Sequence, residues 1–316
     1  RYAEIDREAM FLHIARNRTR VECDGVLIDA PWDLVEQNAD QLRLDYRFAT
    51  DYSIPFRKRK VEVLGNERDL SVSPRADVEP FVVIDVRNGP VTIEDHVKIK
   101  AFTRLEGPCH IGRGSEIFRG QITAGSTIGP VCRIGGEVEN TILHSYVNKY
   151  HDGFLGHSYL CPWVNIGAQS GTSDLKFDYS AVRVPLSGEL LETGLKKVGS
   201  FIGDHTKTAV NSLFDTGTSI GVMSVVLPDG DVLPRHVPSF SRYWRGALDE
   251  GWPLEKLFAI ARMAMSRRER ELTAPQEMLL RLIYDQTESE RQRALARNTP
   301  HRENRDRPES DSQRAA

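Results

Sequence analysis

A repeat of six residues dominates the sequence between positions 91 and 138. Branched aliphatic residues mark it, with a single five-residue step in the series Ile93, Ile99, Leu105, Ile111, Ile117, Ile122, Ile128 and Ile134. The same spacing returns between positions 202 and 226. A period of six is a multiple of the two-residue period of a strand and fits the 3.6-residue period of a helix poorly. The repeat therefore predicts short strands that turn a corner at fixed intervals, as in a parallel β-helix.

Glycine often follows the residue at the aliphatic position. It does so at Gly112, Gly129, Gly135, Gly167, Gly203 and Gly221. Glycine suits a turn that needs an unusual backbone conformation, and it equally suits a close approach between neighbouring coils. The spacing alone leaves both explanations open.

Composition limits the partners of the chain. Its 316 residues are 40% hydrophobic and 28% charged, which is ordinary for a globular protein with a sizeable core. The formal net charge of -3 gives no general attraction to nucleic acid or to an anionic membrane. No apolar run approaches the roughly 20 residues of a membrane span, and the first residues lack the apolar core of a signal peptide. We therefore expect a cytoplasmic protein that binds neither nucleic acid nor membrane.

The four cysteines are expected to be reduced structural thiols. Cys23, Cys109, Cys132 and Cys161 are widely separated and form no Cys-x-x-Cys pair. Two of them stand at small-residue positions of the repeat.

The sequence on either side of the repeat predicts four regions. Residues 1–76 are expected to form a connector or the remnant of an N-terminal domain, with a helix over 4–17, a short strand over 26–28 and a second helix from Pro31. Residues 77–245 form the solenoid, and 246–298 form two amphipathic helices that cover its open end or flank. Thr273 and Gln276 suggest a capping box for the second of these helices. The polar, charged residues 299–316 are predicted to be disordered.

The repeat fails between residues 139 and 165. Histidines, aromatic residues and a lysine stand there in place of small and aliphatic residues. Stacking of coils gives no reason for such residues, so this interruption is the best candidate for a functional site. The long segment 173–197 is expected to leave the solenoid and return to it.

Five short motifs carry a resemblance to a known family. They lie at residues 135–140, 148–157, 164–168, 173–176 and 202–208. Residues 77–240 resemble the acetyltransferase half of the bifunctional N-acetylglucosamine-1-phosphate uridyltransferase/glucosamine-1-phosphate acetyltransferases. They resemble still more the sugar nucleotidyltransferases that carry such a C-terminal solenoid. The spacing does not give the handedness of the coil, and parallel crossovers are right-handed in about 98% of cases. The left-handed coil is therefore what the resemblance alone implies.

The resemblance also implies an activity and a site. In that family a histidine within an Ala-Gly-His turn is the general base, and Gly156-His157 matches it. Tyr159 and Asn165 would orient the sugar or the thioester, Asp174 and Lys176 lie in the matching polar segment, and Lys149 would neutralise a sugar phosphate. The resemblance further implies that coenzyme A lies along the solenoid in a groove between subunits of a homotrimer. Lys197, His205 and Lys207 are candidates to hold its phosphates, although a solvated corner explains them equally well.

Two functions remain open from the sequence. The first is transfer of an acetyl group from acetyl-CoA to an amino- or hydroxy-sugar phosphate or a nucleotide sugar, with His157 as general base. The second is a non-catalytic module that binds a sugar nucleotide or trimerises a nucleotidyltransferase-family protein. The glycine-rich nucleotide signature of that family is absent from these residues, so we expect no nucleotide transfer from them. A metal on His151 and His157, six residues apart, is conceivable, but we expect none because no third ligand with zinc-like spacing follows.

Overall fold

The computed structural model describes residues 7–16, 18–19, 21–22, 25–48, 60–186 and 188–297. The chain forms two units, Arg1–Ala30 and Pro31–Ala316. In the first unit, helix α1 (Arg7–Ala15) confirms the helix expected there. The strand predicted over residues 26–28 is wrong, since these residues lie outside any strand and their side chains are exposed. None of the helices described in either unit is long and apolar enough to cross a membrane.

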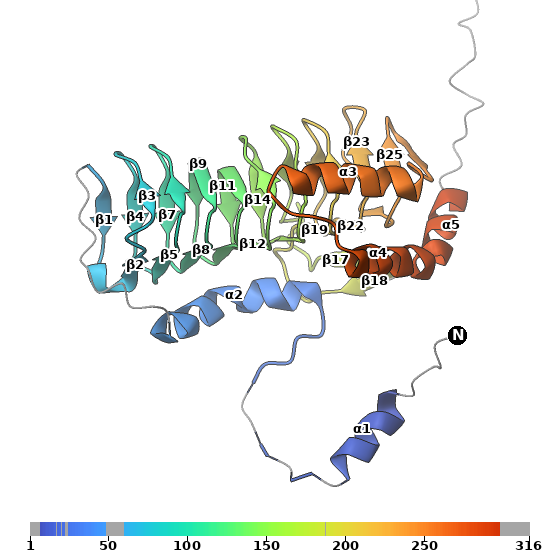
Figure 1. Cartoon of the computed structure of the whole chain (residues 1–316), viewed down its shortest axis with the longest axis horizontal. Coiled ribbons are helices and arrows are strands. Elements are labelled where there is room, and N and C mark those ends of the chain that lie inside the picture. Colours follow the sequence, from blue (N-terminus) through green and yellow to red (C-terminus); the bar gives the residue numbers. More distant parts are fainter. Residues whose placement is uncertain are drawn as a thin grey trace, which may run out of the picture. The chain divides into compact units, whose positions relative to one another are not determined.

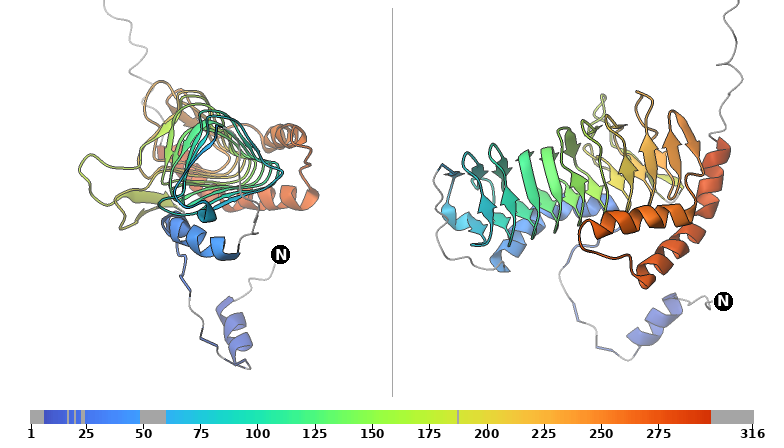
Figure 2. Two further views of the ribbon diagram at one scale, coloured as in Figure 1. Left: turned by 90° about the vertical axis from the view of Figure 1, so that its left-hand side faces the viewer. Right: turned by 45° about the horizontal axis from the view of Figure 1, so that its top comes forward.

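The second unit is built on a parallel β-solenoid of about 11 turns (Figure 1). Its strands form three faces of a triangular prism, as the end view in Figure 2 shows. The first face holds β1 (Glu62–Leu64), β4 (Val83–Asp85), β7 (Arg104–Glu106), the second halves of β9 (Glu116–Ile122) and β11 (Arg133–Glu139), β14 (Phe154–Gly156), β16 (Gly171–Thr172) and β21 (Leu213–Phe214).

The other two faces continue in the same way. The second face holds β2 (Leu70–Val72), β5 (Val91–Ile93), β8 (Cys109–Ile111), β10 (Ser126–Ile128), β12 (Ile142–Leu143), β15 (Tyr159–Leu160), β19 (Phe201–Ile202), β22 (Ser219–Ile220) and β24 (His236–Val237). The third face holds β3 (Asp77–Val78), β6 (Lys98–Ile99), the first halves of β9 and β11, β13 (Asn148–Lys149), β20 (Lys207–Thr208), β23 (Val225–Leu227) and β25 (Arg242–Trp244).

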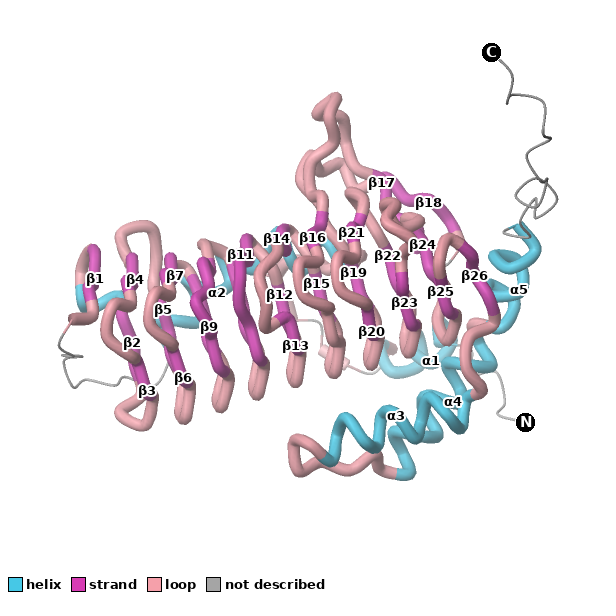
Figure 3. Tube along the Cα trace, turned by 90° about the horizontal axis from the view of Figure 1, so that it is seen from above, coloured by secondary structure: helices cyan, strands magenta, loops and turns pink. Residues whose placement is uncertain are grey.

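The coil is left-handed. Seen from above in Figure 3, the first face runs along the back of the prism and the third along its front, while the second lies at the bottom in Figure 1. The chain passes from back to bottom to front as it advances from left to right, which is the sense of a left-handed screw. The predicted left-handed parallel β-helix is confirmed.

The repeat places its aliphatic residues inside the prism. All eight residues of the series from Ile93 to Ile134 are 0% exposed and belong to one continuous core. Full burial of each such side chain contributes about 1.5–3 kcal/mol. The core residues come from all three faces, so the hexad itself holds the coils together.

The glycines after the aliphatic positions serve close approach between coils. A Cβ added at Gly129 would lie 1.3 Å from the carbonyl oxygen of His144 in the next coil. Gly112, Gly135, Gly167, Gly203 and Gly221 would likewise place a Cβ within 2.9 Å of neighbouring backbone. The close-approach explanation therefore holds for these six positions.

The solenoid is longer than the repeat indicated. It begins at β1, a coil before the expected boundary at residue 77, because Glu62, Val63 and Leu64 pair with β4. The coils also continue through residues 139–165, where β12, β13, β14 and β15 stay in parallel register. The break in the repeat is thus a change of side chains and not of backbone.

Helices cover the solenoid from outside. Helix α2 (Pro31–Asp45) lies along the second face, where Asn38 donates to the carbonyl of Gly125 at 2.6 Å. After the antiparallel pair of β25 with β26 (Ala247–Asp249), the chain forms α3 (Leu254–Ser266), α4 (Ala274–Gln286) and α5 (Glu288–Arg297). Three helices thus replace the two that were expected. The capping box of Thr273 and Gln276 is present, and the predicted disordered tail lies outside the described residues.

The segment between Ser173 and Lys197 leaves the prism and returns, as predicted. It carries the antiparallel hairpin of β17 (Arg183–Leu186) and β18 (Glu189–Glu192). Its two ends return to the solenoid beside β14, where Asp174 and Lys197 meet residues of the earlier coils.

The cysteines described by the structure are free. Cys109 and Cys132 are buried and Cys161 is half-buried. Burial raises the pKa of the Cys109 thiol to about 12, as expected for a structural thiol. Cys23 lies outside the described residues.

Candidate functional site

His157 lies at the corner between the first and second faces, in the turn from β14 to β15. Its φ is 44°, in the left-handed region. Asn140 has φ of 40° at the same corner one coil earlier, so this conformation belongs to the corner and is not by itself a mark of function. Asn and His tolerate it better than most residues with a side chain.

Asp174 holds the imidazole of His157. Asp174 Oδ2 lies 2.7 Å from His157 Nδ1, and the two side chains are 12% and 11% exposed. Burial alone would raise the pKa of Asp174, but the hydrogen bond from His157 and the charge of Lys197 outweigh it and the net pKa is lowered. With Nδ1–H donated to Asp174, Nε2 is the atom of the ring left to accept a proton.

A glycine makes room for this contact. A Cβ on Gly156 would lie 2.6 Å from Asp174 Oδ2 and 2.5 Å from the ring of Phe154. The amide of Gly156 also donates to Thr172 Oγ1 at 3.1 Å, which fixes the first face to the segment that carries Asp174. Glycine is thus required before His157 because a larger residue at position 156 would clash with Asp174 and Phe154.

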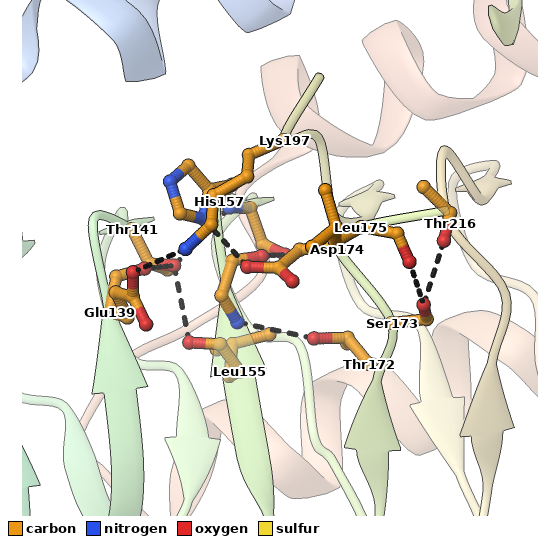
Figure 4. Close-up of polar contacts among 12 residues, drawn as sticks. Glu139, Thr141, Leu155, His157, Thr172, Ser173, Asp174, Leu175, Lys197 and Thr216 are labelled. Carbon is orange, nitrogen blue, oxygen red and sulfur yellow. Dashed lines mark hydrogen bonds and ion pairs between the residues drawn. The ribbon is translucent and has the colours of Figure 1, made fainter. Parts of the chain in front are cut away.

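A second pair adjoins the first. Lys197 Nζ lies 3.0 Å from Glu139 Oε1, at the end of β11 (Figure 4). The hydrogen bond to Glu139 raises the pKa of Lys197 against the opposing effect of burial. One ligand-type atom of each of Glu139, His157 and Asp174 lies within 4.8 Å of the others.

These three side chains are of a kind that can bind a divalent cation. His157 Nδ1 is already bonded to Asp174, however, and the ammonium of Lys197 already neutralises Glu139. The arrangement is therefore better described as a hydrogen bond from the imidazole to Asp174 beside the ion pair of Lys197 and Glu139. His151, the other histidine considered for a metal, lies in the turn between β13 and β14 and is not among these residues.

Lys149 lies inside the prism. It pairs in register with Ile134 and points into the prism, with 2% of the residue exposed. Its Nζ donates to the carbonyls of Gly135, His151 and Gly153 at 2.8, 2.9 and 2.7 Å. The contact with a sugar phosphate stays a prediction, which the burial of the ammonium at this inward register position disfavours.

Three further predicted residues have partners other than His157 and Asp174. Tyr159 belongs to the second face, in the strand next to Phe201. Asn165 lies on the third face and accepts from Asn148 Nδ2 at 2.8 Å. Lys176 stays within its own segment, where it contacts Ser180 and the carbonyl of Ala181. Of the residues assigned to the sugar, the structure places only Asp174 in direct contact with His157.

His205 and Lys207 are covered by helix α3. Together with Leu257 and Ala261 they line a small cavity between the third face and that helix. Burial lowers the pKa of His205 to about 4 and lowers that of Lys207. Their contact with coenzyme A phosphates stays a prediction, which the position of α3 over both side chains disfavours.

A groove of about 780 Å³ adjoins the site on the first face. Its walls are mostly apolar, and they include Leu175, Phe177, Leu213 and Val232. Ser173 and Thr216 also line it and bond to each other at 2.7 Å. Ser173 and Leu175, the residues on either side of Asp174, line the groove, so the groove lies next to the segment that carries Asp174.

Sequence reasoning missed Glu139. It stands inside the motif at residues 135–140, but nothing in the spacing links it to Lys197, 58 positions away. The signal that the sequence offered is that Glu139 follows the inward position of Val138, where the regular repeat ends, so its carboxylate is expected to point outward.

Comparisons with known proteins support the resemblance. No model of a known protein family matches the chain. The chain is 34% identical over 184 residues to a bifunctional sugar-1-phosphate nucleotidylyltransferase/acetyltransferase of Sulfurisphaera tokodaii, covering 50% of this chain and 46% of that protein. It is 27% identical over 238 residues to the bifunctional protein GlmU of Trichormus variabilis, covering 64% and 46%. The chain thus spans less than half the length of these curated relatives.

Two solved acyltransferase structures align only weakly with this chain. An Arabidopsis UDP-N-acetylglucosamine acyltransferase aligns with 12% identity and a TM-score of 0.29, over 68% of this chain and 80% of that one. A Bacillus cereus N-acyltransferase, AntD, aligns with 14% identity and a TM-score of 0.21, over 60% and 81%. TM-scores at this level do not establish a shared fold.

Proposed function

We propose that this chain, a relative of bifunctional nucleotidylyltransferase/acetyltransferases, transfers an acyl group from a coenzyme A thioester to a sugar derivative. The donor expected from the resemblance is acetyl-CoA, and the acceptor is an amino or hydroxyl group of a sugar phosphate or nucleotide sugar. The observation that carries the proposal is the His157–Asp174 contact of 2.7 Å at the matching Gly-His turn.

The pair supplies the chemistry that such a reaction needs. An amine or hydroxyl must lose a proton to attack a thioester carbonyl, and His157 Nε2 accepts it. The bond from the acceptor nitrogen or oxygen to the acyl carbon forms, and the carbon–sulfur bond breaks. The proton held on the imidazole then passes to the departing thiolate. Asp174 holds the ring in the orientation and tautomer that leave Nε2 free, and it stabilises the imidazolium.

The groove beside Asp174 suits the extended arm of coenzyme A. Since His205 and Lys207 lie under α3, they have no part in this proposal. The proposal includes a homotrimer, as the resemblance implies, and action in the cytoplasm. The mass of the protein in solution, measured by light scattering, tests the trimer.

The first prediction concerns His157. Replacement by alanine is expected to lower kcat/KM about 10²–10⁴-fold, because it removes the proton acceptor. The measurement is release of the coenzyme A thiol from acetyl-CoA, with glucosamine-1-phosphate and a panel of amino and hydroxy sugars as acceptors. His151→Ala is the matched control, since that exposed histidine lies outside the pair.

Equal thiol release by the wild type, His157→Ala and a blank would contradict acyl transfer. It would favour instead the non-catalytic module that the sequence leaves open. If the His157→Ala variant keeps full activity, His157 is not the general base, but the proposal of acyl transfer stands.

A further inference from the structure

A cavity of about 440 Å³ lies between helix α2 and the second face, and neither His157 nor Asp174 lines it. One wall comes from β5, β8 and β10, and β12 separates these strands from β15, which follows His157. The other wall comes from α2, which runs along this face in Figure 1, and from the 3-10 helix η1 (Tyr46–Phe48). A small organic molecule fits a cavity of this size, since ligand pockets in proteins occupy about 300–1,000 Å³.

Two carboxylates line the cavity. Asp45 stands on the α2 wall and Glu94 on the sheet wall. In the part of the chain that the structure describes, neither carboxylate pairs with a lysine or an arginine, and no lysine or arginine lines the cavity. Asp45 accepts from the neutral amide of Gln41 at 2.6 Å, and Glu94 Oε1 lies 3.6 Å from His110 Nε2. His110 is therefore the one group that could neutralise them.

The imidazole of His110 does not carry the charge needed at neutral pH. It points outward from β8 and lines the cavity beneath α2. Burial lowers the pKa of His110 from its ordinary 6.5, although the charges of Glu94 and Asp45 oppose the shift. The ring is therefore neutral at pH 7. The negative charges of Asp45 and Glu94 are left uncompensated in the cavity.

A further polar pair in the cavity accepts hydrogen bonds from a ligand. Asn38 donates to the carbonyl of Gly125 at 2.6 Å, and its amide oxygen accepts from Thr127 Oγ1 at 3.0 Å. With its proton already used, the Thr127 hydroxyl can only accept from a ligand, as the carboxylates also do. The cavity therefore suits a ligand that donates hydrogen bonds.

Two aromatic residues complete the lining at the end of α2. Tyr46 and Phe48 both belong to η1, and the hydroxyl of Tyr46 donates to the carbonyl of Arg68 at 2.8 Å. This bond fixes the ring of Tyr46 beside the cavity. The face of an aromatic ring attracts an ammonium group. Uncompensated carboxylates, hydrogen-bond acceptors and aromatic rings together are the chemistry that recognises an organic amine.

We propose that this cavity binds a small organic cation with two or more amino groups, of the size of a short polyamine. Asp45 would hold one ammonium and Glu94 another, since the two carboxylates belong to opposite walls. The site is independent of the proposed acyl transfer and uses none of the residues around His157.

The test is binding of putrescine and spermidine to the whole chain, measured by calorimetry at about pH 7.5, where carboxylates are charged and such an imidazole is neutral. Butane-1,4-diol is the matched neutral ligand, because it has the carbon chain of putrescine with hydroxyls in place of the amines. We expect saturable binding of both amines and none of the diol. Glu94→Gln and Asp45→Asn should each weaken amine binding about three- to tenfold, because each removes one charge and keeps an acceptor.

Glu62→Gln is the matched control variant. Glu62 is an exposed carboxylate of β1 on the first face, so its replacement changes the net charge equally without touching the cavity. It should leave the dissociation constants of both amines unchanged. The thermal midpoints of the three variants show whether each is folded.

Three results would overturn this inference and leave the proposed acyl transfer standing. They are no saturable amine binding by the wild type, equal binding of the diol, and cavity variants that bind the amines no more weakly than Glu62→Gln does. If a cavity variant fails to fold, hydrogen exchange of the wild type decides instead. Slower exchange of the backbone amides of residues 38–46 with spermidine supports the site, and slowing that spares these residues overturns it.

Discussion

Lys149 occupies a place in the interior where the preceding coil has Ile134. A buried ammonium is costly unless its hydrogen bonds are made, and three backbone carbonyls accept from this one. Burial nevertheless lowers the pKa of Lys149 to about 8, while Asp152 and Glu137 oppose the shift. The residue therefore acts on stability, by joining the turn before β14 to the neighbouring coil.

This shift predicts a dependence of stability on pH. The pKa of Lys149 is about 8 in the folded protein and 10.5 ordinarily, so the unfolded chain holds the proton more tightly between these values. The free energy of unfolding contributed by this group is constant below pH 8 and rises with pH up to about 10.5. We expect wild type to gain about 2–3 kcal/mol over this window relative to Lys149→Met. Urea unfolding of both proteins from pH 7 to 10.5 measures the difference.

A flat difference between the two proteins would contradict the burial of the charge. Lys98→Met serves as the control, since Lys98 is exposed on the third face. Its difference from wild type should not rise over the same window.

At the scale of the elements, stacking of coils depends on backbone contact. Strands of two or three residues bury one or two side chains each, so successive turns must come close together for the sheets to form. Gly129 shows the requirement most sharply, because the carbonyl of His144 fills the place of its missing Cβ.

Gly129→Ala is therefore expected to destabilise the solenoid by more than about 3 kcal/mol, or to prevent folding, because backbone and not a flexible side chain must move. Gly171→Ala is the matched control, since no atom lies within 4 Å of the Cβ that it would add. It should change the free energy of unfolding by less than about 1 kcal/mol. Denaturant titration of both variants gives the comparison, and equal stability would show that the coils can separate at Gly129.

At the scale of the whole molecule, the C-terminal helices protect the later coils. Phe258 of α3 is 0% exposed and packs with Met223, Phe240 and Leu280 in a core separate from that of the prism. Tyr284 of α4 meets Phe240 edge to face at 5.1 Å. This second core explains how α3 comes to cover His205 and Lys207 on the third face.

Phe258→Ala should lower the free energy of unfolding by about 3–5 kcal/mol, because it leaves a cavity in this second core. Met263→Ala on the same helix is the control, since that side chain is 68% exposed and its removal should cost less than about 0.5 kcal/mol. Urea unfolding followed by tryptophan fluorescence measures both changes. A similar small loss in the two variants would mean that α3 contributes little to the stability of the solenoid.

The sequence alone determined the solenoid architecture, because the six-residue repeat marks directly which side chains point into the prism. The residues from Ile93 to Ile134 are all in the core, and the glycines beside them are where coils touch. The Gly-His turn also identified the histidine that Asp174 holds. Each of these follows from local spacing or from a short motif.

Only the tertiary structure decided which charged groups meet. Lys149 looked like a break in the repeat, yet it takes an inward position because its ammonium finds three carbonyls there. Glu139 and Lys197 are 58 positions apart, and a segment outside the repeat brings them together. Spacing specifies where a side chain points within its own coil. The return of a long segment to His157 and the docking of a helix over His205 and Lys207 depend instead on contacts between residues far apart in the sequence.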